Sequence, residues 1–224
     1  MVELEHIGQR YDGGTAILAD VSLRLEPGGF YFLTGASGTG KTALLKIIHL
    51  AQAPSRGKLR LFGTDTAGLD RDARAGLRRR IGMVFQDLRL IEGLSAGDNV
   101  ALPLRIAGIA ERRIRDHVPE LLAWVGVTDR ADMPAAALSA GERQLVAIAR
   151  AIVRRPELLI ADEPTAQADE DIALFLIGIF ERLNQLGTTV LIATRDIAFA
   201  RRFAHRRFLL DQGMISDASG APER

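Results

Sequence analysis

Cysteine is absent from this chain of 224 residues, and neither sign of charge is in excess. Without thiols the protein can form no disulfide framework and no thiolate metal site, a composition typical of proteins in a reducing cytosol. Lysine and arginine together number 29 and acidic residues 28, which leaves a net charge of +1. Proteins that bind nucleic acid usually carry a concentrated basic excess, so we expect no nucleic-acid partner.

Long apolar runs are lacking as well. Nowhere do about 18 apolar residues follow one another, the length that a membrane-spanning helix needs. The first residues, Met1 to His6, are too acidic and have too short an apolar run for a signal peptide. We therefore expect that no segment spans a bilayer and that any contact with a membrane passes through another protein. Hydrophobic residues still make up 47% of the chain, which is ample for a buried core.

Short apolar segments alternate with helical patterns along much of the chain. Residues 30–34, 158–161 and 189–193 are nearly all apolar, as expected of strands that are buried on both faces. Apolar and polar residues alternate in 21–25, which indicates a strand with one solvent-exposed face. This predicts an α/β fold with a mostly parallel core sheet, antiparallel strand near the N-terminus and an inserted helical subdomain. We expect helices at 98–107, 111–125 and 141–153. We further expect a single domain 1–224, with its core at about 1–86 and 157–215, its helical subdomain at about 87–156 and a loose tail at 216–224.

A glycine-rich turn between a predicted strand and a predicted helix matches the P-loop pattern at every fixed position. Backbone N–H groups of such a loop turn inward around phosphate oxygens, and the following helix points its positive end at them. Lys41 is expected to contact the terminal phosphates and Thr42 to ligate Mg²⁺. An ordinary turn is the alternative, but a chance match is on the order of one per cent. The predicted nucleotide-binding residues are Gly35, Ala36, Ser37, Gly38, Thr39, Gly40, Lys41 and Thr42.

Two carboxylates, Asp162 and Glu163, follow the apolar residues 158–161. Open parallel sheets bind ligands at the carboxyl ends of their strands, which is where these acids would lie. We predict that Asp162 holds Mg²⁺ through water and that Glu163 acts as a general base toward the attacking water. Alone, the pattern also fits a helix cap before Pro164, but beside a P-loop it becomes a strong indication.

Residues 138–144, Leu-Ser-Ala-Gly-Glu-Arg-Gln, resemble the signature motif of ABC ATPases, and the resemblance runs from about residue 2 to 215. It implies that Gln86 is the Q-loop residue, a catalytic residue that also contacts Mg²⁺. It further implies that Tyr11 stacks on adenine and that 165–169 is the D-loop. The implied cofactors are ATP and Mg²⁺, and the implied partner is a second copy of the chain.

In that family each ATP lies between the P-loop of one copy and the signature of the other. The chemistry agrees, because Ser139 offers a hydroxyl, Gly141 can expose its backbone N–H, and the helix that starts there aims its positive end at phosphate. Ser139 followed by Glu142 is also a capping box, and both interpretations can hold together.

Three positions depart from the family pattern. Ala140 stands where the signature usually has glycine, and Ala168 where the D-loop usually has leucine. Arg195 stands where the family has its switch histidine, which contacts the terminal phosphate and helps to hold the attacking water. Arginine can donate to phosphate but is longer and stays protonated. Two functions therefore remain open: a cycling ATPase, or a slow ATP-gated clamp that serves as a scaffold.

Within the family, residues 32–35, 79–87 and 98–104 resemble the FtsE group of cell-division ATPases. This implies the membrane protein FtsX as partner and a place at the cytoplasmic face of the bacterial inner membrane. ATPases of lipoprotein release and macrolide-type efflux are the alternatives. We expect the segment after Gln86 to line the groove for a partner helix, and we expect Trp124 to be a core residue. The groove residues would be Leu88, Leu90, Ile91 and Leu94.

Overall fold

The computed structural model describes residues 1–10, 16–166 and 168–219. Within these residues the strands form one sheet of ten, in the order β5-β4-β1-β2-β10-β9-β3-β8-β7-β6. Their bounds are β1 (Val2–Arg10), β2 (Ala16–Leu25), β3 (Phe30–Thr34), β4 (Arg56–Leu61), β5 (Thr64–Asp65), β6 (Ile81–Val84), β7 (Leu158–Asp162), β8 (Thr189–Thr194), β9 (Arg206–Asp211) and β10 (Met214–Asp217).

The sheet is parallel in its core and antiparallel toward the N-terminus. Strand β3 pairs in parallel with β8 and β9, and β7 pairs in parallel with β6 and β8. Strand β1 pairs antiparallel with β2 and β4. All residues of β3, β7 and β8 are buried, as their apolar composition predicts. The predicted fold class is confirmed.

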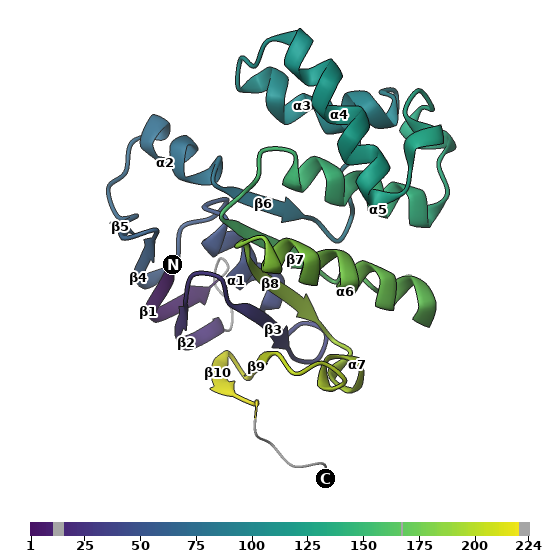
Figure 1. The fold of residues 1–224 in the computed structure, drawn as a ribbon. Coiled ribbons are helices and arrows are strands. Elements are labelled where there is room, and N and C mark those ends of the chain that lie inside the picture. Colours follow the sequence, from purple (N-terminus) through teal and green to yellow (C-terminus); the bar gives the residue numbers. More distant parts are fainter. Residues whose placement is uncertain (11–15, 167, 220–224) are drawn as a thin grey trace.

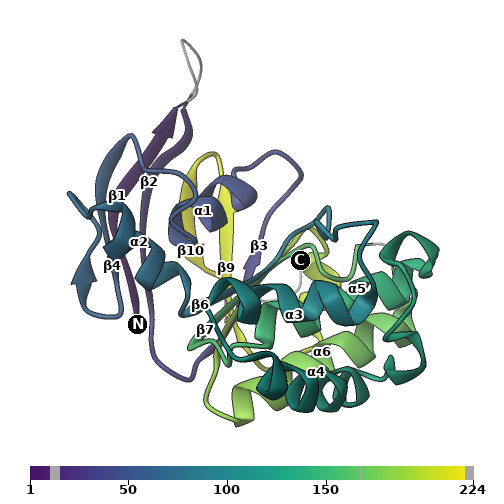
Figure 2. The same ribbon diagram turned by 90° about the horizontal axis from the view of Figure 1, so that it is seen from above.

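Seven α-helices occur in the described residues (Figure 1). Helix α1 lies between the β1–β2–β4 strands and the parallel strands (Figure 2), whereas α3, α4 and α5 gather at the opposite end of the molecule. The bounds are α1 (Lys41–Ile48), α2 (Arg71–Arg78), α3 (Ala96–Ile106), α4 (Glu111–Val125), α5 (Ala140–Ile152), α6 (Glu170–Gln185) and α7 (Ile197–Arg201).

Helices α3, α4 and α5 enclose an apolar core of their own, which includes Val100, Leu122 and Val146. Helix α5 also packs Ile148 and Ile152 against the core of the parallel sheet. It therefore ties the helical part to the strands. We propose that this separate core defines the helical subdomain, with the boundaries predicted above at about 87 and 156.

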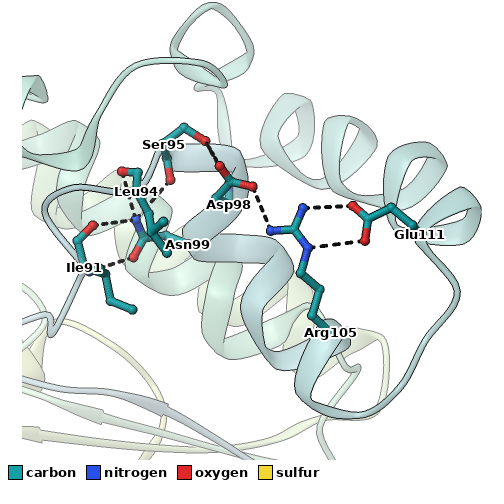
Figure 3. Close-up of polar contacts among 7 residues, drawn as sticks. All are labelled: Ile91, Leu94, Ser95, Asp98, Asn99, Arg105 and Glu111. Atoms are coloured by element: carbon teal, nitrogen blue, oxygen red, sulfur yellow. Dashed lines mark hydrogen bonds and ion pairs between the residues drawn. The ribbon is translucent and has the colours of Figure 1, made fainter.

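Polar side chains fix the start of this helical part (Figure 3). Asn99 is fully buried, where it accepts a hydrogen bond from Ile91 N at 2.8 Å and donates to the carbonyls of Ile91, Leu94 and Ser95. Arg105 bridges Asp98 at 2.7 Å and Glu111 at 2.8 Å, and so joins α3 to α4. Hydrogen bonds from Arg105 and Ser95 lower the pKa of Asp98. Asn99 thereby ties residues 91–95 to the start of α3.

Three expectations about individual segments are wrong. Trp124 is 36% exposed and is not a core residue, because the buried stripe of α4 runs along another face. The tail does not begin at residue 216: β10 continues to Asp217 and pairs with β9, and Arg207 N donates to Ser219 Oγ. Helix α3 also begins two residues before its predicted start, at Ala96, because Ser95 caps it. Residues 220–224 lie outside the described residues.

Candidate functional site

The P-loop connects β3 to α1, and its glycines adopt backbone conformations or positions that a side chain would disturb. Gly40, directly before α1, has φ 104°, a left-handed conformation that favours glycine. At Gly35, an added Cβ would lie 2.4 Å from the backbone oxygen of Leu210 in β9. The loop therefore passes close to the C-terminal end of β9, and the N-terminus of α1 follows it directly.

The close approach at Gly35 gives a testable consequence for stability. We expect Gly35→Ala to destabilise the fold by about 1–3 kcal/mol, because backbone must shift to admit the methyl group. For a chain of this size each 1 kcal/mol lowers the melting temperature by about 2–4 °C. Gly178→Ala is the control, because Gly178 lies in α6 with no atom within 4 Å of the added Cβ. Thermal unfolding followed by circular dichroism checks this, and an unchanged midpoint for Gly35→Ala would contradict it.

Lys41 is the first residue of α1, and its side chain lies over the loop. It is only 6% exposed. Its Nζ donates to the carbonyl oxygens of Gly35 at 2.7 Å and Ala36 at 3.0 Å, and it lies 3.6 Å from Glu163 Oε1. A buried cation is thus held at the mouth of the loop, within reach of the carboxylate of the residue that follows β7.

Asp162, the last residue of β7, is joined to the P-loop by a direct hydrogen bond. Thr42 Oγ1 donates to Asp162 Oδ2 at 2.8 Å. The carboxyl is 3% exposed, and burial raises its pKa against the lowering effect of the Thr42 hydrogen bond. Its other oxygen, Oδ1, is buried and has no hydrogen-bond partner among the described residues. A hydroxyl and a carboxylate with an oxygen to spare fit a hydrated Mg²⁺ ion, which prefers oxygen ligands.

Glu163 lies just beyond β7 in a left-handed backbone conformation, with φ 50°. Its backbone N–H donates to Ala193 O of β8 at 2.9 Å. Its two carboxylate oxygens face different partners: Oε1 lies near Lys41 Nζ, and Oε2 accepts from Arg195 N at 3.1 Å. Strained backbone of this kind recurs at functional sites, where surrounding contacts hold it in place.

One cavity of about 240 Å³ brings most of the predicted site residues together; we call it the P-loop cavity. Lys41 and Thr42 line it together with Gln86, Glu163 and Arg195. Tyr11, the predicted adenine contact, lies outside the described residues. The lining residues are Ile17, Ser37, Gly38, Gly40, Lys41, Thr42, Ala43, Lys46, Gln86, Glu163, Ala166 and Arg195.

The signature residues do not line this cavity in the described part of the chain. Gly141 lines a smaller neighbouring hollow, which shares Gln86 and Glu163 with the first. Ser139 caps α5 and is exposed, and the capping box with Glu142 is present: Ser139 N donates to Glu142 Oε2 at 2.8 Å. That hydrogen bond and the one from Arg130 lower the pKa of Glu142 to about 2, with Arg130 contributing most. The N-terminus of α5 is thus capped within the chain and is exposed at Ser139 and Ala140.

The predicted site residues did not include Ile17, Ala43, Lys46 or Ala166, all of which line the P-loop cavity, although Ala166 lies within the predicted D-loop. The position of Lys46 could have been predicted, because it lies four residues after Thr42 and therefore on the same face of α1. Its charge lowers the pKa of Asp162 and partly opposes the effect of burial. Ile17 lies on β2 and could be placed here only from the fold.

The groove predicted after Gln86 is not formed by the four expected residues. Leu90 is 8% exposed and belongs to the core of α3, α4 and α5, and Leu88 packs against that core. Ile91 alone is well exposed, at 46%. A groove does exist on this side, but other residues line it, and of the segment after Gln86 only Arg89 contributes.

Known ATP-binding proteins are similar to this chain along nearly its whole length. The family described as ABC transporter matches residues 18–166. The cell division ATP-binding protein FtsE of Escherichia coli K12 is 41% identical, over 98% of this chain and 99% of that protein. The methionine import ATP-binding protein MetN of Brucella abortus strain 2308 is 37% identical, over 97% of this chain and 59% of the longer relative.

A solved structure has the same fold. The dimeric ATP-binding cassette MJ0796, in a post-hydrolysis state bound to ADP and Pi, matches with a TM-score of 0.90 at 32% identity. The match covers 98% of this chain and 100% of the other. Among the described residues, no helix has both the length and the apolar character needed to cross a bilayer.

Proposed function

The chain belongs to the ABC transporter family of ATP-binding proteins, and from this premise we propose that two copies clamp MgATP and hydrolyse it to drive an integral membrane partner. The observation that carries the proposal is the P-loop cavity. There the hydrogen bond from Thr42 to Asp162 and the contact between Lys41 and Glu163 join both motifs in one site. Family membership implies ATP binding and hydrolysis. The roles proposed below for individual residues rest on the motif resemblance and, where the residues are described, on the geometry of the P-loop cavity.

Phosphate binding is assigned to the P-loop, residues 35–42. Backbone N–H groups and the N-terminus of α1 supply positive partial charge, and Lys41 supplies a full charge. Mg²⁺ would be held by the Thr42 hydroxyl, by Asp162 through water and by Gln86. When bound, the ion offsets negative charge on the phosphate oxygens. Tyr11 would stack on adenine.

Hydrolysis is assigned to Glu163 as general base and to Arg195 and Gln86 as catalytic residues. Oε2 of Glu163 already accepts from the backbone of Arg195, so its orientation is fixed. A fixed carboxylate can accept a proton from water as that water attacks. The exposed Arg195 guanidinium lines the same cavity, where it can donate to a phosphate oxygen.

The second copy of the chain would complete the site. Ser139 and Gly141 lie at the exposed N-terminus of α5, where hydroxyl and backbone N–H donors can bind the ATP held by the other P-loop. A Cβ added at Gly141 would meet no atom within 4 Å, so the backbone there is open to approach. The dimeric state of the similar cassette supports this arrangement. ATP then acts as part of the interface, and hydrolysis removes it.

The membrane partner we propose is FtsX, with a function in bacterial cell division and control of peptidoglycan hydrolysis at the cytoplasmic face of the inner membrane. The 41% identity to FtsE over nearly the full length supports this choice. The similarity to MetN keeps a transport function as an alternative, as does the resemblance to lipoprotein-release and macrolide-type efflux ATPases.

A slow, ATP-gated scaffold clamp is the second candidate, and Arg195 is the observation that favours it. Arginine stays protonated and cannot accept a hydrogen bond from the attacking water, unlike a neutral histidine. Measuring ATP turnover with the membrane partner present separates a cycling ATPase from a clamp.

ATP binding should depend on Lys41, the cation held at the loop. We expect Lys41→Ala to weaken MgATP binding at least tenfold, or about 1.4 kcal/mol. Lys58→Ala is the matched control, because it removes the same charge from an exposed position on β4. Isothermal titration calorimetry gives both affinities. An unchanged affinity for Lys41→Ala would refute the assignment of the P-loop.

A further inference from the structure

Helix α5 carries a carboxylate in its first turn, at the end that the proposed function assigns to phosphate. Glu142 is the third residue of this helix and closes the capping box with Ser139. Ser139 and Gly141, which we propose as donors to the ATP of the other copy, lie in the same turn. A negative charge stabilises the N-terminus of a helix, but it also repels a polyphosphate that approaches the same end. The charge of Glu142 therefore has to be offset before ATP can bind there.

Both oxygens of the Glu142 carboxylate are engaged within the chain. Arg130 Nε donates to Oε1 at 2.5 Å, and Ser139 N donates to Oε2 at 2.8 Å. Among the described residues, Arg130 is the only basic side chain within 4 Å of this carboxylate, and the neighbouring Arg143 lies 3.7 Å from Glu92 instead. The hydrogen bonds from Arg130 and then Ser139 lower the pKa of Glu142 to about 2, so its charge persists at neutral pH.

The backbone that carries Arg130 is held in place on both sides. Arg130 is the last residue of a short 3-10 helix, η1 (Thr128–Arg130), which follows α4. Its N–H donates to the carbonyl of Val127 at 3.1 Å, and Val127 is buried in the core of the helical part. Its own carbonyl accepts from Met133 N at 3.0 Å, and the carbonyl of Met133 accepts from Ala96 N, at the start of α3, at 2.8 Å. The guanidinium therefore reaches Glu142 from a fixed support.

The donors of the signature remain available while Glu142 is neutralised. Ser139 Oγ accepts a hydrogen bond from Glu142 N at 3.3 Å, and this contact does not use the hydroxyl proton of Ser139. Within the part of the chain that the structure describes, that proton has no acceptor. The ion pair thus removes a repulsive charge and leaves the hydroxyl free to donate to an anion.

We propose that Arg130 is a positioning residue of the composite site, because it neutralises Glu142 and so allows the N-terminus of α5 to accept the ATP held by the other copy. This inference rests on the proposed function and adds a residue that lies outside the sequence motifs. Arg130 acts through Glu142 and is assigned no contact with the nucleotide. Since the signature serves the ATP of the other copy, the loss of Arg130 should weaken the ATP-bound dimer and leave the ATP affinity of a single chain unchanged.

Three variants test the proposal in a Glu163→Gln parent chain, which retains ATP: Arg130→Met, Glu142→Gln and the two together. Light scattering over a range of protein concentrations gives the dimer dissociation constant at saturating MgATP. We expect Arg130→Met to raise this constant at least about tenfold, because an uncompensated carboxylate then faces phosphate. The double variant should dimerise within about threefold of the parent chain, because no negative charge is left to neutralise.

The single variant Glu142→Gln should dimerise at least as tightly as the parent chain. Glutamine can replace glutamate in a capping box, so this substitution removes the charge and keeps the helix start. A double variant as defective as Arg130→Met would overturn the inference, because Arg130 would then act independently of Glu142. A tenfold weaker dimer for Glu142→Gln, or an unchanged dimer for Arg130→Met, would also overturn it.

Two controls separate this role from a general effect on the fold. Arg112→Met removes the same charge from an exposed position of α4 and should dimerise like the parent chain. Calorimetry should give the same ATP affinity for all variants, since a partly exposed ion pair contributes little to stability. An Arg130→Met chain that binds ATP more weakly by the same factor would overturn the inference. A parent chain that does not dimerise with MgATP would instead refute the composite site of the proposed function.

Discussion

Glu163→Gln should abolish steady-state ATP hydrolysis and leave the ATP-bound chain as a stable dimer. The substitution keeps the shape of the side chain and an oxygen that can accept from Arg195 N, but it removes the base. General-base catalysis typically contributes about 10²–10⁴-fold, so we expect turnover to fall at least a hundredfold. The substitution Glu163→Gln also removes the ion pair between the Glu163 carboxylate and Lys41 Nζ, which are 3.6 Å apart. Lys41 is then freer to contact phosphate, and ATP should bind at least as tightly.

Phosphate release and light scattering measure the two parts of this prediction. The variant should be a monomer without nucleotide and a dimer with MgATP. Glu5→Gln, an exposed substitution on β1, is the control and should keep wild-type turnover. Turnover within a few-fold of wild type would remove Glu163 from the role of base. A dimer both with and without ATP would argue against ATP as part of the interface.

Arg195→His should raise steady-state turnover about ten- to a hundredfold without tightening ATP binding. One lost transition-state contact typically costs about 10²–10³-fold in rate, and the arginine retains a donor that recovers part of this. The backbone N–H of residue 195 holds Glu163 at 3.1 Å, and this contact does not depend on the side chain. The substitution therefore changes the side chain that faces the attacking water, and it leaves the placement of the Glu163 carboxylate unchanged.

The comparison is made with saturating MgATP and the membrane partner present. Arg201→His, an exposed change in α7 outside the P-loop cavity, is the control. Equal or lower turnover for Arg195→His would mean that the site has adapted around arginine. The slow-clamp function would then lose its main support.

The chemistry of this site was predictable where it lies in short contiguous motifs. Residues 35–42 carry both the loop conformation and its charge, and the apolar run 158–161 leads directly into Asp162. The pairing of β7 with β8 could not be predicted from such motifs. It brings Glu163 to Arg195, which is 32 residues distant in the chain. Tertiary neighbours of this kind depend on strand order, which local patterns do not specify.

Trp124 shows an error that the periodicity of the sequence could have prevented. The buried residues of α4 are Ile114, Val118, Leu122 and Val125, which form one stripe. At about 100° per residue, Trp124 lies roughly a quarter turn from that stripe. The expectation of a core position relied on residue type and neglected helical phase.

Complementation between two inactive variants tests the composite site most directly. Lys41→Ala disables the P-loop, and Gly141→Asp places a carboxylate where the other copy's phosphate would bind, at a position with no atom within 4 Å of the added Cβ. A mixed dimer has one site with both defects and one intact site. We expect each variant alone to be inactive and an equal mixture to recover about a quarter of wild-type turnover, since half of the dimers hold one working site each. A mixture as inactive as its components would contradict hydrolysis at a site shared between two copies.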